Sequence, residues 1–176
     1  MPGLDAVAHV RTARLVGRRP EPDDAEGYVR FYGDPRIPDE LWPADLRTPG
    51  QARATLAELI AHWERWGFGV WTVLLPDGEI IGHAGVQHTT IEGRPEVEVL
   101  WFIHPDHWNR GYATEVAREA VRVAFDVLEL DDLISFTVRD NAPSRAVMEK
   151  LGMSYEREVE HVGLPHVLYR LARPRT

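Results

Sequence analysis

The sequence contains no cysteine, and this absence removes several kinds of chemistry at once. Without thiols the chain cannot form disulfides, bind metals through thiolates or use a cysteine nucleophile. It also has no apolar run long enough to span a bilayer, and its first residues lack the ordered regions of a signal peptide. We therefore expect a cytoplasmic protein without a membrane partner, and a short flexible terminus over residues 1–11.

An excess of positive charge is lacking as well. The 20 Lys and Arg residues are outnumbered by 28 Asp and Glu residues, which gives a formal net charge of −8. This balance argues against broad binding to nucleic acid, which depends on basic surface meeting phosphate. It suits a cationic substrate such as an amine, whereas a polyanionic ligand would need a local positive site. The histidines and carboxylates show no compact ligand spacing, so no metal is predicted.

The chain shows no internal repeat and no low-complexity segment, and its 176 residues suit a single domain over residues 1–176. Strand-like and helix-like patterns alternate, which is typical of a mixed α/β domain. We expect helices over about 23–32, 49–66, 112–128 and 142–151. We expect strands over 12–17, 68–75, 79–87, 96–103, 133–138, 153–159 and 166–171. In strand 96–103, Val97, Val99, Trp101 and Ile103 lie on one side, and Glu98, Leu100 and Phe102 on the other.

The segment at residues 104–115 carries the strongest signal for chemistry. A strand stopped by Pro105 turns and enters a helix whose first turn contains glycine and small residues. Gly111 and Ala113 allow close approach to backbone N–H groups, the helix start adds roughly half a positive charge, and Arg110 adds a full one. By itself this glycine–alanine pattern also fits an ordinary strand–helix connection. The chain has no Gly-x-Gly-x-x-Gly and no Gly-Lys-Ser/Thr, so Rossmann and P-loop sites fit poorly.

Two runs together resemble a known family. Residues 108–115, WNRGYATE, resemble the cofactor-binding motif of the GNAT acetyltransferases in their RimJ/RimL-like (ribosomal-protein N-terminal acetyltransferase-like) branch. Residues 141–153, NAPSRAVMEKLGM, resemble the second signature of that branch, at the expected distance along the chain. Segments 12–16, 66–69 and 81–85 agree with its N-terminal half, so the resemblance covers residues 12–171.

The resemblance implies an α/β (α+β) fold of the GNAT type, with a central mixed, mostly antiparallel sheet that is splayed at the middle and flanked by helices. It implies acetyl-CoA as cosubstrate, with the pantetheine arm lying in the splayed sheet like a missing strand. The residues that it assigns to binding are Trp101, Phe102 and Ile103 for pantetheine, Arg110, Gly111, Tyr112, Ala113 and Thr114 for pyrophosphate, Asn141 and Ser144 near the thioester, and Arg145 at a phosphate. Asn141 also fits a helix N-cap, and Arg145 also fits a solvated helix position.

The catalytic residues are less fixed by the resemblance. Glu98 matches the branch's acidic strand position and is the leading general base, although a solvated strand glutamate or an ion pair explains it equally well. Many members place a tyrosine acid where this chain has Met148, so we expect Ser144 to protonate the departing thiolate, with Tyr155 as a second candidate. The acceptor would be a primary amine, on a small molecule or a peptide N-terminus, and two copies could pair through the last strands or the sheet edge. The alternative is a non-catalytic acyl-CoA-binding sensor.

Overall fold

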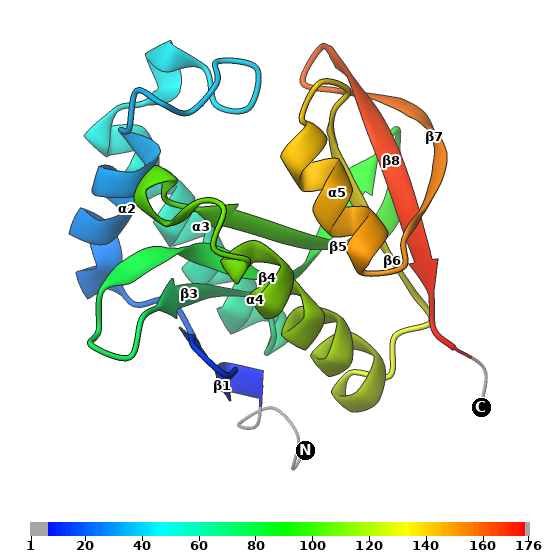
Figure 1. Cartoon of the computed structure of the whole chain (residues 1–176), viewed down its shortest axis with the longest axis horizontal. Coiled ribbons are helices and arrows are strands. Elements are labelled where there is room, and N and C mark those ends of the chain that lie inside the picture. The colour runs from blue at the N-terminus through cyan, green and yellow to red at the C-terminus, as the bar shows by residue number, and fades with distance from the viewer. Residues whose placement is uncertain (1–6, 175–176) are drawn as a thin grey trace.

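One mixed sheet runs through the middle of the molecule, and the helices lie around it (Figure 1). The computed structural model describes residues 7–174. The strands are β1 (His9–Arg11), β2 (Val16–Arg18), β3 (Val70–Leu74), β4 (Ile80–Ile91), β5 (Arg94–Ile103), β6 (Asp132–Val138), β7 (Ser154–His161) and β8 (Leu164–Ala172). Their order in the sheet is β1-β2-β3-β4-β5-β6-β8-β7.

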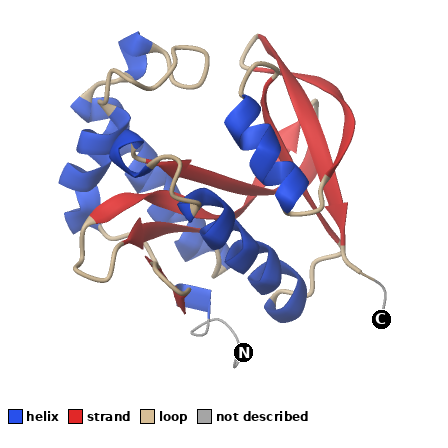
Figure 2. Ribbon diagram, in the orientation of Figure 1, coloured by secondary structure: helices blue, strands red, loops and turns tan. Residues whose placement is uncertain are grey.

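The helices flank this sheet on both sides, as Figure 2 shows. They are α2 (Ala25–Tyr32), α3 (Pro49–Trp66), α4 (Tyr112–Arg122) and α5 (Ala142–Lys150), and α4 continues into a π-helical turn over Val123–Val127. Short 3₁₀ turns occupy Pro22–Asp24, Ala44–Leu46 and Pro105–His107. No helix within residues 7–174 is both long and apolar enough to cross a membrane.

The sheet comes apart between β5 and β6. Every other neighbouring pair is antiparallel, whereas β5 and β6 are parallel and share a single ladder position, Glu98 opposite Ile134. Beyond that position the two strands diverge, so that β1–β5 and β6–β8–β7 form two wings (Figure 1). The predicted mixed, mostly antiparallel sheet that is splayed at the middle and flanked by helices is therefore confirmed.

Strand β5 divides its side chains between two cores. Val97, Val99 and Trp101 pack in the cluster that contains Val116 of α4 and Met148 of α5. Leu100 and Phe102 pack in the cluster formed by buried residues of α2 and α3. The predicted alternation along this strand is confirmed, and it places Glu98 on the side of Leu100 and Phe102.

The boundaries of α3 follow from local chemistry. The Thr48 side chain accepts a hydrogen bond from the Gln51 N–H, and Pro49 occupies the first turn, where its missing N–H is harmless. Gly67 ends the helix in the left-handed conformation, with φ of 72°, which a residue without Cβ adopts readily. These predicted ends are confirmed.

The first predicted strand is wrong in its placement. Residues 12–15 form a turn, closed by a hydrogen bond from the Thr12 N–H to the Leu15 carbonyl and stabilised by the Thr12 hydroxyl. This turn joins β1 to β2, and β1 pairs with β2 from His9 to Arg11. A flexible terminus was expected over residues 1–11. Residues 1–6 lie outside the described residues, but His9–Arg11 form β1, in which Val10 is buried, so the expectation is wrong for this strand.

Candidate functional site

The divergence of β5 from β6 exposes main-chain groups in the middle of the sheet. The His104 N–H donates to the Ile81 carbonyl of β4, which fixes the direction in which β5 presents its backbone. Because N–H and C=O groups alternate direction along a strand, the backbone of Phe102 and Leu100 also faces β4. The backbone of Trp101 and Ile103 therefore faces β6, beyond the position at which the ladder ends.

This geometry changes one prediction about the gap. Trp101 and Ile103 present their main-chain groups to it, but Phe102 does not, because its backbone pairs with His83 of β4. The Ile103 carbonyl is also occupied, since the Trp108 indole donates to it at 2.7 Å. A ligand amide in the gap would therefore find three free main-chain groups, the N–H and C=O of Trp101 and the N–H of Ile103. Phe102 would contribute only its side chain.

The helix that follows β5 begins without a side-chain cap. Gly111 is its N-cap residue in the left-handed conformation, with φ of 77°, and the first intrahelical bond runs from the Glu115 N–H to the Gly111 carbonyl. The N–H groups of Tyr112, Ala113 and Thr114 thus precede the hydrogen-bonded ladder of α4. Uncapped N–H groups at a helix start suit an anion.

The helix that follows β6 begins at the same edge of the sheet, because β5 and β6 are parallel. Here the N-cap is filled: the Asn141 side chain accepts a hydrogen bond from the Ser144 N–H and donates to the Thr137 hydroxyl at 2.9 Å. The capping interpretation of Asn141 is confirmed. Ser144 is half-buried in the first turn, and Met148, one turn later, is buried in the core.

The two predicted phosphate-binding arginines have different surroundings. The Arg110 side chain is exposed beside the start of α4, and its carbonyl accepts a hydrogen bond from Arg14. Arg145 lies along α5, where its guanidinium donates to the Tyr169 hydroxyl at 3.3 Å and to the Arg139 carbonyl at 3.2 Å. The Arg145 side chain is thus fixed by hydrogen bonds and faces the last strands.

Tyr155 does not lie at the gap. It sits on the edge strand β7 with 54% of its surface exposed, and its ring packs edge-to-face on Tyr169 of β8. Strand β8 separates it from β6. This placement argues against Tyr155 as an acid for a reaction between β5 and β6.

Glu98 lies at the fork itself, in the one ladder position that β5 and β6 share. Only 7% of it is exposed, and its carboxylate accepts a hydrogen bond from the Gln87 amide at 3.1 Å. Burial raises the pKa of Glu98 to about 7, although the Gln87 hydrogen bond opposes the rise. A carboxyl that titrates near neutrality can take up and release a proton under physiological conditions.

Glu96, two residues earlier on the same side, is committed elsewhere. Both of its oxygens accept hydrogen bonds from Arg170, at 2.9 and 3.0 Å. The same guanidinium also contacts Asp132 and Glu156. Glu96 therefore ties β5 to β8 and is not available as a second base.

An aromatic wall continues from Glu98 along the same face. Phe102 packs against Tyr32 with ring centroids 4.9 Å apart, and Tyr32 packs against Trp42 at 4.6 Å. His83 lies behind this wall, where its Nε2 atom and the Tyr32 hydroxyl are 2.7 Å apart. Burial lowers the pKa of His83 to about 3, so the imidazole is neutral and structural.

The segment between α2 and α3 contains the acidic residues Asp39, Glu40 and Asp45. Asp39 is bound by Arg47, while Glu40 and Asp45 are exposed. Among residues 7–174, no three His, Asp or Glu side chains are grouped so as to hold a metal ion.

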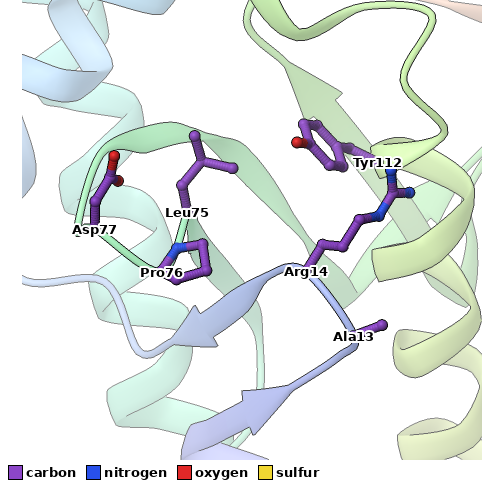
Figure 3. Close-up of a pocket in the computed structure, with 6 residues that line it drawn as sticks. All are labelled: Ala13, Arg14, Leu75, Pro76, Asp77 and Tyr112. Atoms are coloured by element: carbon purple, nitrogen blue, oxygen red, sulfur yellow. The ribbon is translucent and has the colours of Figure 1, made fainter.

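A pocket of about 400 Å³ lies beside the start of α4 (Figure 3). Its lining residues are Ala13, Arg14, Leu75, Pro76, Asp77 and Tyr112. Apart from Tyr112 of α4, these residues belong to the turns between β1 and β2 and between β3 and β4, and none of them belongs to β5 or β6.

Two residues of this region were not predicted from the sequence. Gln87 could have been found by counting back from a hairpin turn at residues 92–93, since it pairs directly with Glu98. Arg14 carries no local signal, because its partners in α4 lie about 100 positions away along the chain.

The chain is similar to a family of known proteins. Residues 14–154 match the family model described as "Acetyltransferase (GNAT) domain". The chain is 27% identical over 149 residues to "Uncharacterized N-acetyltransferase YnaD" of Bacillus subtilis (strain 168), covering 84% of each protein. The crystal structure of the acetyltransferase from Agrobacterium tumefaciens str. C58 matches with a TM-score of 0.78 and 28% identity over 94% of both chains.

A third similarity concerns the fold. RimJ of Mycobacterium smegmatis, solved in complex with CoA-disulfide, matches with a TM-score of 0.71 over 93% of this chain and 86% of that one. At 16% identity this likeness shows a common fold.

Proposed function

Because this chain belongs to the GNAT acetyltransferase family, we propose that it transfers an acetyl group from acetyl-CoA to a primary amine. The observation that carries the proposal is the single ladder position between β5 and β6, which leaves strand edges open inside the sheet. Pantetheine contains two amides and can pair with such an edge as an extra strand would. The N–H and C=O of Trp101 and the N–H of Ile103 face that space.

The loop at residues 110–114 supports the same ligand. Gly111 permits the left-handed start of α4, and the first-turn N–H groups precede the intrahelical ladder. Arg110 supplies a full positive charge beside them. A pyrophosphate attached to pantetheine in the gap would lie where β5 feeds α4, so one ligand satisfies both features. Coenzyme A fits this pair of features, and in RimJ of Mycobacterium smegmatis a CoA-disulfide is bound.

The acceptor amine must lose its proton to become a nucleophile. With a reference pKa of 7.7–8.0, roughly a tenth of an α-amine is already neutral at pH 7, whereas a lysine amine is neutral only about once in 2,500 molecules. Glu98 is buried at the fork and holds its proton near neutrality, so its ionised form can accept the amine proton during attack. The demand on this single base is smaller for an α-amine, and this favours a peptide N-terminus or a small amine of similar pKa.

In the transfer, the amine nitrogen forms a bond to the thioester carbonyl carbon while the carbon–sulfur bond breaks. Glu98 takes the amine proton, and the Ser144 hydroxyl passes a proton to the departing thiolate while it accepts one from a solvent water, so that the serine is regenerated. Ser144 lies in the first turn of α5, beside the end of β6, whereas Met148 is buried and carries no transferable proton.

The acceptor would approach from the face that carries Glu98. The wall formed by Phe102, Tyr32 and Trp42 lies on that face, under the segment that joins α2 to α3. A non-catalytic acyl-CoA sensor is the second candidate, and Met148 at the usual tyrosine position is the feature that favours it. The buried, titratable Glu98 favours the enzyme.

Two measurements on the purified protein test the proposal. Calorimetric titration with acetyl-CoA and with free CoA should show saturable binding that Arg110→Ala weakens. A panel of amines, including a peptide with a free N-terminus and its N-blocked form, should then release CoA thiol only with free amines. Absence of binding at low salt would remove the acetyl-CoA assignment. Binding without thiol release from any amine would favour the sensor.

A further inference from the structure

The turn between β1 and β2 grips the start of α4 through Glu115. One Glu115 oxygen accepts hydrogen bonds from the Thr12 hydroxyl at 2.6 Å and from the Arg14 N–H at 2.8 Å. The other accepts from the Arg14 Nε at 2.7 Å. The turn itself is closed by the bond from Thr12 to the Leu15 carbonyl, so α4 is fastened to a rigid point.

Arg14 extends this contact into the loop. Its Nη1 atom donates to the Arg110 carbonyl at 2.9 Å, and its guanidinium lies 4.7 Å from the centre of the Tyr112 ring. A Cβ placed on Gly111 would lie 3.4 Å from Nη2 of the same group. One side chain thus contacts Arg110 and Tyr112 and lies close to Gly111 between them, and Figure 3 shows it reaching from the turn to Tyr112.

The loop needs such support because its backbone is unusual. Asn109 and Gly111 both have positive φ, 58° and 77°, and the N-cap of α4 receives no side-chain hydrogen bond. A residue other than glycine adopts the left-handed region only when its surroundings compensate. The Arg14 hydrogen bond to the Arg110 carbonyl lies between these two positions, where it restrains both.

The pair also removes an electrostatic conflict. Glu115 lies in the first turn of α4, where an unpaired carboxylate would repel a polyanion bound at the helix start. Arg14 neutralises it through a direct ion pair, 2.7 Å between Nε and the carboxylate. Burial favours the protonated acid, but the hydrogen bonds from Thr12 and Arg14 keep the pKa of Glu115 below its ordinary value.

We propose that Arg14 and Glu115 are positioning residues that hold the loop at residues 110–112 in its pyrophosphate-binding conformation from outside the site. The inference rests on the proposed binding of acetyl-CoA. The guanidinium binds the loop through the Arg110 carbonyl, so it leaves the first-turn N–H groups of α4 to the ligand. Its effect should therefore appear only with ligands that carry the pyrophosphate.

The experiment compares two acetyl donors in three variants. Acetyl-CoA carries the pyrophosphate, and S-acetylpantetheine lacks it. Arg14→Ala removes the contact with the loop, and Arg14→Lys retains the charge but cannot bond Glu115 and the Arg110 carbonyl together. Arg122→Ala is the matched control, because Arg122 forms a similar bidentate pair with Glu119 on the same helix, away from the loop.

We expect Arg14→Ala and Arg14→Lys to weaken acetyl-CoA binding and raise its KM about tenfold, the size of one charged hydrogen bond, with kcat unchanged. Neither should alter kcat/KM for S-acetylpantetheine, and Arg122→Ala should behave as wild type with both donors. Equal losses with both donors, full affinity in Arg14→Lys, or no difference from Arg122→Ala would each overturn the inference. If wild type itself binds no acetyl-CoA, the proposed function fails instead, so the two failures are distinguishable.

Discussion

The buried Glu98 carboxyl at the fork should make both the stability and the activity of the protein depend on pH. Glu98 titrates near pH 7 in the folded protein, against an ordinary value of 4.5. Between these two pH values the unfolded chain releases this proton while the folded chain keeps it. The free energy of unfolding should therefore fall as pH rises from 4.5 to 7, by about 3 kcal/mol from this group, and then level off. Below pH 4.5 both states are protonated and the group contributes no pH dependence.

Glu98→Gln isolates that contribution, because it retains the side-chain shape and an oxygen that can accept from Gln87. Urea unfolding of wild type and variant at pH 5 and at pH 8.5 gives the change, since other titrating groups cancel in the difference. The variant should gain about 2.5 kcal/mol relative to wild type between these pH values. The same gap at both pH values would refute the assignment of the raised pKa to Glu98.

Activity supplies the second readout. With acetyl-CoA saturating, kcat/KM for the amine should rise through pH 7 in wild type, because ionised Glu98 is the form that accepts a proton. Glu98→Gln should lose this rise, together with roughly a hundredfold in rate near neutrality, while acetyl-CoA affinity is preserved. Glu96→Gln is the control, because Glu96 is on the same side of β5 but is bound by Arg170. An unchanged pH profile in Glu98→Gln removes this residue from the mechanism.

Three further predictions concern the loop, the acid and the core. Gly111→Val and Gly93→Val both force a β-branched residue to φ near 77–78°, each at a cost of about 1–2 kcal/mol. Only Gly111→Val should abolish acetyl-CoA binding by calorimetry, and equal binding in the two variants would contradict the loop assignment. Ser144→Ala should lower kcat roughly a hundredfold at unchanged acetyl-CoA affinity, whereas full activity would return the acid role to water. His83→Phe should soften acid unfolding, because wild type loses about 5 kcal/mol as pH falls from 6.5 towards 3; identical acid midpoints would argue against a neutral buried His83.

Local signals in the sequence predicted the long elements well. The cap at Thr48, the stop at Gly67 and the alternation along β5 each depend on neighbours within one or two turns of chain. Such signals act wherever the segment lies, which is why the helices and central strands were found. The three-residue strand β1 is too short to show a period, and its pairing with β2 identifies it only in three dimensions.

The details of the site depended on register, which local patterns do not determine. The hairpin turn at Glu92 and Gly93, with φ of 49° and 78°, sets the pairing of β4 with β5 and so decides which backbone groups face the gap. Without it, Phe102 could not be told apart from Trp101 and Ile103. Likewise, the burial of Glu98 and its bond from Gln87 follow from that pairing, and the surroundings of Tyr155 follow from the position of β8.

Strand β5 answers three separate demands with three separate sets of atoms. Its odd side chains fill the core beneath α4, its even side chains face α2 and the side proposed for the acceptor, and its odd main-chain groups face the gap. Since every residue type offers the same N–H and C=O, a ligand read by the main chain places little restriction on which side chains evolve there. Proteins with this fold can therefore diverge widely in sequence and keep the gap. The matches at 28% and 16% identity, with TM-scores of 0.78 and 0.71, fit that freedom. New acceptors can then arise by changes at even positions such as Leu100 and Phe102, without disturbing the edge on which the donor would lie.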